Sequence, residues 1–238
     1  MSVMRLDKLL AETGAGSRSE VKKILKNGAV TVNGAMEKRP DRKIDTDCDT
    51  VMYQNREVKY EPFIALMLNK PAGCITATED RSHKTVMDDI CHPAKDRLFP
   101  VGRLDIDTEG LLLLVNEGEL AHRLLSPKHH AEKTYYVRVE GRLTEETVRA
   151  FEEGMDIGEK KKTLPAKLSI LDSGEISEAE VTLYEGKFHQ VKRMFAACGL
   201  KVLYLKRISM AGILLDPSLE PGQWRALTPE ECLRLKER

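Results

Sequence analysis

The sequence predicts an α+β protein with a large mixed sheet, preceded by a small separate domain. Segments typical of strands and of helices follow one another without the regular rhythm of a parallel βαβ protein. The amino-terminal part has its own helix and hairpin patterns, apart from the rest. The chain has 238 residues, of which 41% are hydrophobic, so it is long and apolar enough for a small and a medium domain.

The amino-terminal part is predicted to begin with two helices. Leucines within residues 6–10 follow helical spacing, and Gly14 and Gly16 end that helix. Ser17 and Glu20 form a capping-box pattern, so a second helix begins there and continues to Gly28.

A hairpin is predicted after the second helix. Residues 29–32 have the composition of a strand, and Asn33–Gly34 favours a tight turn into a returning strand at 35–37. Arg18, Lys22 and Lys26 lie four residues apart and form one basic stripe on the helix before it. Such a stripe is typical both of a solvated helix face and of an RNA-binding surface, and its composition leaves both open.

Residues 4–10, 16–21 and 28–34 together resemble the S4 RNA-binding module, a small α/β domain. The resemblance implies that structured RNA binds to the second helix and the hairpin. We expect an S4-like domain at residues 1–52, a polar linker at 53–61 and a catalytic domain at 62–238. The RNA-binding residues expected in the first domain are Arg5, Arg18, Lys22, Lys23 and Lys26.

The second domain is predicted to mix strands and helices. Its most distinct element is a run of leucines and valine bounded by turns, which is typical of a buried strand. Thr144 is a predicted helix N-cap, and Gly199 ends another helix. We expect strands at 63–68, 111–115, 134–139, 180–184 and 201–208, and helices at 119–125, 143–154 and 189–198.

The loop directly before the leucine strand concentrates charge, with Arg103, Asp105, Asp107 and Glu109 within a few residues. A carboxylate at the mouth of a buried strand is held rigidly and partly desolvated, as catalytic carboxylates must be. The loop also fits a purely structural role in strand entry. Alternate carboxylates of an extended loop suit Mg²⁺, but the arginine beside them disfavours a metal site. The residues alone leave the choice open.

Two further segments carry polar groups that suit chemistry on a nucleotide. Tyr135 at the end of segment 126–135 offers a flat face on which a base can stack. His189, Lys192 and Arg193 form a polar stripe on a predicted helix. A cation from this helix would keep an aspartate of the loop ionised, and an ionised, desolvated aspartate is a nucleophile.

Composition excludes several other classes. Lys and Arg number 38 and so do Asp and Glu, so any basic surface is local. Five scattered cysteines favour a reducing cytosol, and no apolar stretch reaches the length of a signal peptide or membrane span. Cys91–His92 and His129–His130 lack zinc-site spacing, and no phosphate-binding glycine loop is present. We expect a cytoplasmic protein that needs no metal and no cofactor.

The charged loop and three other motifs are similar to those of the RsuA-type pseudouridine synthases, and the similarity spans the whole chain in the family's order. The motifs lie at 68–73, 102–112, 132–135 and 186–195. The resemblance implies the pseudouridine synthase fold, with a large mixed and mainly antiparallel sheet. It also implies an rRNA-modifying isomerase that uses no cofactor, because uridine and pseudouridine contain the same atoms.

The resemblance assigns roles to single residues. Asp105 matches the essential aspartate, and Arg103 matches an arginine that neighbours it and helps to occupy the place of the extruded base. Tyr135 matches the tyrosine that stacks on the target uracil, and Lys192 matches the basic partner of the aspartate. Asp107 matches a position without a chemical role, so we expect it to serve loop structure. Further RNA contacts are expected from Lys133, His189, Gln190 and Arg193.

The segment 189–194 looks more like enzymes of the small ribosomal subunit than like their large-subunit relatives. The expected target is uridine 516 of 16S rRNA, free or in an assembling subunit, and the protein is expected to act as a monomer without membrane contact. Three alternatives remain: a 23S rRNA pseudouridine synthase, a non-catalytic RNA-binding assembly factor, and a hydrolase that uses Asp105 and Asp107 as an acid–base pair.

Overall fold

The computed structural model describes residues 3–126 and 131–237 and divides into two compact units. The first unit comprises Met1–Ile64 and Cys91–Leu98, and the second comprises Ala65–Ile90 and Phe99–Arg238. The segment Cys91–Leu98 was expected in the catalytic domain. It belongs to the first unit because Arg97 lies over the ring of Tyr60, 5.1 Å from its centroid, and 3.9 Å from a carboxylate oxygen of Glu12.

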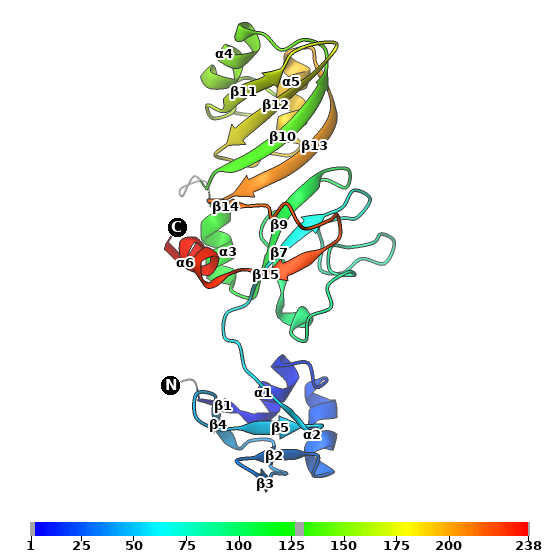
Figure 1. The fold of residues 1–238 in the computed structure, drawn as a ribbon, viewed down its shortest axis with the longest axis vertical. Helices are drawn as coiled ribbons and strands as arrows, with labels where there is room; N and C mark the ends of the chain where they lie inside the picture. The colour runs from blue at the N-terminus through cyan, green and yellow to red at the C-terminus, as the bar shows by residue number, and fades with distance from the viewer. Residues whose placement is uncertain (1–2, 127–130, 238) are drawn as a thin grey trace. The chain divides into compact units, whose positions relative to one another are not determined.

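The first unit has two helices and two small antiparallel sheets around a core of leucine, valine and isoleucine side chains. One sheet has the strand order β3-β2-β5-β6, and the other pairs β1 with β4 (Figure 1). The elements are β1 (Val3–Arg5), α1 (Leu6–Glu12), α2 (Arg18–Lys26), β2 (Val30–Val32), β3 (Ala35–Met36), β4 (Lys43–Asp45), β5 (Val51–Tyr53), β6 (Arg56–Glu57) and the 3₁₀ turn Lys95–Arg97.

Two local predictions for this unit are confirmed. Ser17 caps α2, and its backbone N donates to Glu20 Oε2 at 2.8 Å in the reciprocal bond of a capping box. Asn33 and Gly34 have φ of 52° and 80°, which is the backbone of a tight hairpin turn. A second hairpin, formed by β5 and β6, occupies part of the range 53–61 that was expected to be linker. Gln54 and Asn55 turn it with φ of 51° and 60°.

The second unit contains a nine-stranded sheet with the main order β11-β12-β10-β13-β9-β7-β15 (Figure 1), and the short strands β8 and β14 pair with β9 and β13, respectively. All strand pairs described in this sheet are antiparallel except β13 with β9. The strands are β7 (Ala65–Lys70), β8 (Phe99–Pro100), β9 (Glu109–Val115), β10 (Lys133–Glu140), β11 (Lys167–Asp172), β12 (Ile176–Leu183), β13 (Lys201–Met210), β14 (Ile213–Leu214) and β15 (Trp224–Ala226). The predicted large mixed sheet is therefore confirmed.

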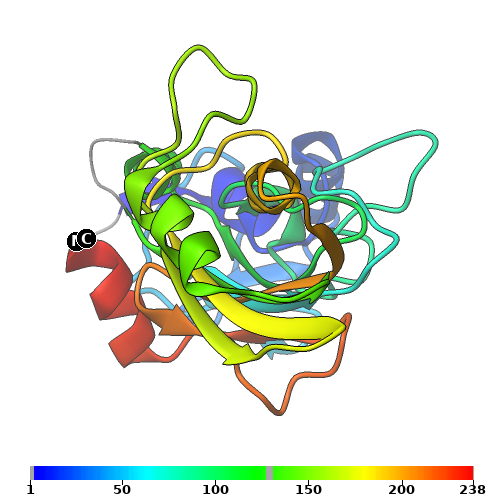
Figure 2. The same ribbon diagram turned by 90° about the horizontal axis from the view of Figure 1, so that it is seen from above.

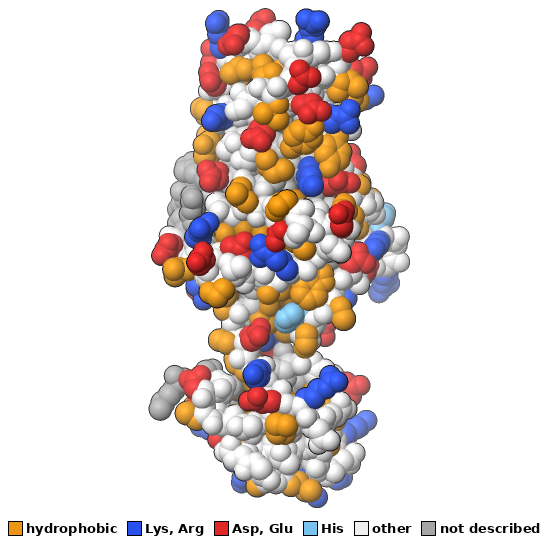
Figure 3. All heavy atoms as spheres, viewed as in Figure 1, with side chains coloured by type: hydrophobic (Ala, Val, Ile, Leu, Met, Phe, Trp, Pro, Cys, Tyr) orange, Lys and Arg blue, Asp and Glu red, His pale blue; other side chains and the backbone are white. Residues whose placement is uncertain are grey.

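Four helices accompany this sheet: α3 (Gly118–Leu125), α4 (Glu145–Glu153), α5 (Gln190–Ala197) and α6 (Pro229–Glu237). Helices α4 and α5 cover the same face of the sheet (Figure 2), and the rings of Phe151 and Phe195 pack between them with centroids 4.9 Å apart. Thr144 caps α4 as predicted. On the face drawn in Figure 3, acidic and basic side chains are interspersed within each unit, in line with the balanced charge.

The parallel contact between β9 and β13 joins the two antiparallel parts of the sheet. It consists of two residue pairs, Glu109 with Lys206 and Gly110 with Arg207. Gly110 has φ of +99°, and a Cβ atom at this position would lie 2.2 Å from the carbonyl oxygen of Arg207. Glycine is therefore required where the charged loop enters the sheet.

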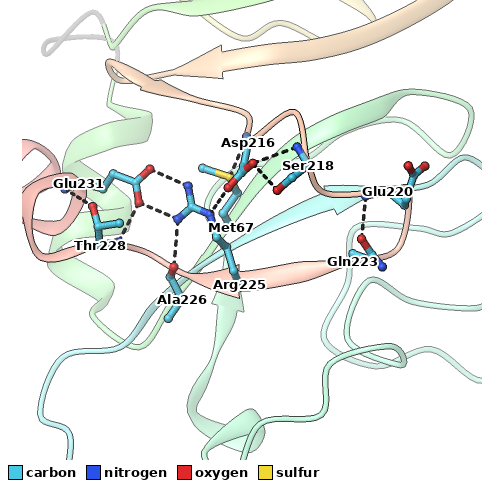
Figure 4. Close-up of polar contacts among 9 residues, drawn as sticks. All are labelled: Met67, Asp216, Ser218, Glu220, Gln223, Arg225, Ala226, Thr228 and Glu231. Carbon is cyan, nitrogen blue, oxygen red and sulfur yellow. Dashed lines mark hydrogen bonds and ion pairs between the residues drawn. The ribbon is translucent and has the colours of Figure 1, made fainter.

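Strand β15, which the sequence did not predict, is held by Arg225 (Figure 4). Its Nε donates to Asp216 Oδ2 at 2.7 Å, and its two terminal nitrogens donate to the carboxylate of Glu231 at 2.8 and 2.9 Å. Hydrogen bonds from Ser218 and from Arg225 lower the pKa of Asp216 to about 2. The guanidinium thus ties the edge strand to α6 and to the loop after β14.

Candidate active site

The charged loop at residues 102–108 is held by hydrogen bonds from Lys70 at the end of β7. The side chain of Lys70 is fully buried, and its Nζ donates to the carbonyl oxygens of Pro71 and Thr108, each at 2.9 Å. Burial lowers the pKa of Lys70. A buried ammonium that bonds backbone carbonyls fixes the path of the chain just after Asp105.

Two more contacts fix the same loop on either side of Asp105. Thr76 Oγ1 donates to the carbonyl oxygen of Leu104 at 2.8 Å and accepts from its backbone N at 3.0 Å. The backbone N of Gly73 donates to the carbonyl oxygen of Ile106 at 2.7 Å. Neither Lys70 nor Thr76 is recognisable from the sequence as a site residue, although the Lys-Pro-Ala-Gly turn that contains Lys70 belongs to one of the motifs.

The three carboxylates of the loop lie in different surroundings. Asp105 Oδ2 lies 3.1 Å from Lys192 Nζ, and Asp107 Oδ1 lies 2.5 Å from the same nitrogen. Glu109 turns away and accepts a hydrogen bond from the hydroxyl of Tyr204 at 2.7 Å. Burial and this hydrogen bond raise the pKa of Tyr204. The structure thus separates Glu109 from the pair that shares the lysine.

Lys192 on α5 is the common partner of Asp105 and Asp107. Burial opposes its charge, but the hydrogen bonds to Asp107 and Asp105 outweigh that effect and raise the pKa of Lys192. The bond from Lys192 also lowers the pKa of Asp107. Asp107, expected to serve loop structure alone, is therefore a direct partner of the site lysine, although its side chain is 66% exposed. His189 Nε2 lies 3.5 Å from Asp105 Oδ1 on the other side.

A cavity of about 490 Å³ opens beside these groups, and its lining includes Asp105, Lys192 and Tyr135. This volume lies in the range of small-molecule sites and exceeds what one nucleobase needs. The Tyr135 side chain comes from β10 and is 9% exposed. Arg103 also lines the cavity, and within the described residues its exposed guanidinium takes part in no hydrogen bond or ion pair.

Three residues expected to contact RNA are buried or held by other groups of the protein. Lys133 and Gln190 are 8% and 4% exposed, and both line the cavity and not the outer surface. The amide of Gln190 bonds Glu185 Oε1 and the backbone N of Lys187, each at 2.8 Å. Arg193 donates to Glu159 Oε1 at 2.8 Å and to the carbonyl oxygen of Ile157, so its guanidinium holds the loop after α4.

The basic stripe of the first unit is exposed, as an RNA-binding surface must be. Arg18, Lys22, Lys23 and Lys26 all lie on the outer side of α2. Arg5 is 55% exposed, and its guanidinium bonds both carboxylate oxygens of Asp7 at 2.8 and 3.0 Å.

His129 and His130, considered for zinc, lie outside the described residues. Across residues 3–126 and 131–237, no helix has the length and apolar character that a membrane crossing requires.

Comparisons with known proteins agree with this site. The model of the RNA pseudouridylate synthase family matches residues 64–197, and the S4 domain model matches residues 4–51. The RNA pseudouridine synthase YtzG of Bacillus subtilis, which carries the label uncharacterized, is 49% identical over 238 residues, covering 98% of this chain and 99% of its own.

Two further relatives are each named ribosomal small subunit pseudouridine synthase A. That of Haemophilus influenzae is 41% identical and covers 98% of this chain and 99% of its own length. That of Escherichia coli is 38% identical and covers 96% and 98%. A crystal structure of a pseudouridylate synthase superposes with a TM-score of 0.69 at 40% identity, covering 98% of this chain and 99% of that one. The chain therefore belongs to the RsuA-type RNA pseudouridine synthases, isomerases in which an S4 domain precedes the catalytic domain.

Proposed function

We propose that the protein converts uridine 516 of 16S rRNA to pseudouridine, in free rRNA or in an assembling small subunit. Relatives named for the small ribosomal subunit, at 38–41% identity over nearly the whole chain, support this target. The segment 189–194, which looks like that of small-subunit enzymes, gives the same indication, and its residues 189–192 line the cavity.

The reaction needs an extruded base and a group that acts on the sugar or the base. The N1–C1′ bond breaks, the uracil turns, C5 bonds to C1′, and one proton moves from C5 to N1. Leaving the helical stack costs the uridine a few kcal/mol, and stacking on Tyr135 returns about 1–3 kcal/mol. Arg103, exposed at the rim with no protein partner among the described residues, is free to fill the space that the base vacates.

The observation that carries the proposal is the position of Asp105. Its carboxylate lies between Lys192 Nζ at 3.1 Å and His189 Nε2 at 3.5 Å and lines the cavity that also contains Tyr135. A carboxylate with a fixed counter-ion beside a cavity that can hold a base is placed to attack C1′ or C6, or to remove the C2′ proton. Each of these routes requires Asp105 and leaves the atom count unchanged.

A purified assay tests the role of Asp105. Asp105→Asn should abolish pseudouridine formation and leave RNA affinity within a few-fold. Asp107→Asn is the matched comparator from the same loop: it removes a partner of Lys192 that is 66% exposed, and product should still form. Substantial product from the Asp105 variant would refute the assignment.

Carbodiimide mapping of rRNA from cells with and without the protein tests the target. A reverse-transcription stop at uridine 516 that disappears on deletion and returns with the wild-type chain, but not with Asp105→Asn, is the expected result. A lost stop in 23S rRNA with an unchanged stop in 16S rRNA would replace the proposed target. No lost stop in either rRNA would refute rRNA modification.

A further inference from the structure

The floor of the cavity is one face of the sheet. Lys133 and Tyr135 on β10 and Leu205 and Arg207 on β13 are alternate residues of their strands, so their side chains point to the same face. Tyr135 and Arg207 are directly opposite each other in the antiparallel β10–β13 pair. A base stacked on the tyrosine would therefore have one edge next to the arginine.

Arg207 is a buried cation without an acidic partner. Its side chain is 2% exposed, and its Nε donates to the carbonyl oxygen of Leu111 at 2.7 Å. Its Nη2 has no hydrogen-bond partner, and no ion pair in the described part of the chain includes this residue. A buried, charged group with an unused hydrogen-bond donor lowers the stability of the fold. A role in binding a ligand would explain why this arginine is nevertheless buried here.

Lys133 adds a second buried cation to the same floor. Its Nζ donates to the carbonyl oxygen of Ala131 at 2.7 Å and forms no ion pair within residues 3–126 and 131–237. Burial, and then repulsion by Arg207, lower the pKa of Lys133 to about 8. Two uncompensated positive charges at one floor favour a ligand that is negative or becomes negative there.

The walls indicate that this ligand is a base and not a phosphate. Leu125, Leu183, Leu205 and Val191 line the cavity together with the tyrosine, which suits a flat, mainly apolar ring. A phosphate would have to leave water completely to reach a guanidinium that is 2% exposed. The exposed Arg103 at the rim is the better partner for the RNA backbone.

Uracil becomes negative during the reaction itself. When the N1–C1′ bond breaks, the bonding electron pair leaves with N1, and the charge spreads over N1, O2 and O4. The charge is lost again when C5 bonds to C1′ and the proton passes from C5 to N1. Hydrogen-bond donors fixed where charge develops lower the barrier most, because they need no reorganisation at that moment.

We propose that Arg207, with Lys133 beside it, donates hydrogen bonds to a carbonyl oxygen of the extruded uracil and stabilises the anionic base formed on bond cleavage. This inference rests on the proposed pseudouridine synthase activity of the site. It makes Arg207 a catalytic residue distinct from Asp105.

The test compares an RNA fragment that contains the target uridine with the same fragment carrying 5-fluorouridine there. Fluorine withdraws electrons and stabilises the uracil anion, so bond cleavage in this substrate depends less on the protein. Single-turnover loss of the intact nucleoside, followed by mass spectrometry, measures the cleavage step for both. Arg207→Met should slow cleavage of uridine about 100–1,000-fold, as loss of one such donor does elsewhere.

The expected signature is a smaller loss with 5-fluorouridine than with uridine for Arg207→Met, with RNA affinity within a few-fold of wild type. Arg207→Lys, which keeps the charge, should recover part of the rate. Lys133→Met leaves the hydrogen bond from Arg207 to Leu111 in place. It should also slow cleavage of uridine more than cleavage of 5-fluorouridine, so this variant tests the inference if Arg207→Met fails to fold.

Equal losses with both substrates in the folded variants would overturn the inference and leave Arg207 a structural residue. A wild-type chain that makes no pseudouridine in the unmodified fragment or in rRNA would refute the proposed function instead. The wild-type control therefore separates the two failures.

Discussion

Replacing Gly110 with alanine should break the contact between β9 and β13. The new Cβ atom would lie 2.2 Å from the carbonyl oxygen of Arg207 and 2.8 Å from its backbone N. A side chain at this positive φ costs about 1–3 kcal/mol by itself. Separating the strands to relieve the clash leaves buried backbone groups of the two residue pairs unbonded, at about 1–3 kcal/mol for each group. With two such groups, the loss is about 3–9 kcal/mol, against a typical total of about 5–15 kcal/mol.

Gly73→Ala is the matched control, because Gly73 has φ of +85° and no atom lies within 4 Å of a Cβ built there. Urea unfolding followed by the fluorescence of Trp224, the one tryptophan of the chain, reports on the second unit alone. Gly73→Ala should cost only the backbone strain, about 1–3 kcal/mol. Gly110→Ala should cost at least about 2 kcal/mol more or abolish cooperative unfolding. Equal losses for the two variants would refute the role given to the strand contact.

Three further predictions concern other parts of the chain. Thr76→Val keeps the shape of the side chain but leaves the backbone N and carbonyl oxygen of Leu104 without their hydrogen bonds. Because the loop that positions Asp105 would loosen, the rate of pseudouridine formation should fall about tenfold or more while RNA affinity stays unchanged. An unchanged rate would contradict this. The pKa of Asp216 is held at about 2 by bonds from Ser218 and a neighbouring guanidinium, below its usual 3.8, so its stabilising effect is complete above about pH 4 and is lost as the pH falls toward 2. Asp216→Asn should therefore flatten the fall in unfolding free energy over this range, measured by urea titration at each pH, and an unchanged slope would show that the carboxylate is not responsible. The double variant with Lys22→Ala and Lys26→Ala should bind RNA more weakly, and the slope of log affinity against log salt concentration should become less steep by about 1–2. The rate of pseudouridine formation at saturating RNA should stay unchanged. A slope identical to that of the wild type would show that the basic stripe does not bind RNA.

The local parts of the fold could be predicted because their causes lie within a few residues. The capping pair Ser17 and Glu20, the Asn33–Gly34 turn and the Thr144 cap each act through the nearest backbone groups. Strand β15 could not be predicted in the same way. It has three residues and exists because it pairs with β7, from which the chain separates it by more than 150 residues.

The candidate site shows the same division. The residues around Asp105 and the polar stripe with Lys192 stand out in the sequence by composition and motif. Lys70 and Arg207 do not, because a lysine or arginine in a strand is normally exposed and its burial depends on the packing of other strands. Asp107 was assigned to loop structure, and only the position of α5 shows that it shares the lysine with Asp105.

The parallel contact between β9 and β13 also bears on the order in which the enzyme acquires its function during folding. Asp105 precedes β9, whereas Tyr135, Lys192 and Arg207 come from the antiparallel strands and the helix on the other side of that contact. The antiparallel pairs β7–β9, β10–β12, β11–β12 and β10–β13 each join residues closer in the chain, whereas Glu109 and Lys206 in the β9–β13 contact are 97 residues apart, so this contact is entropically a later event. A chain with most of its secondary structure in place can thus still lack an active site, because catalytic competence depends on this long-range contact.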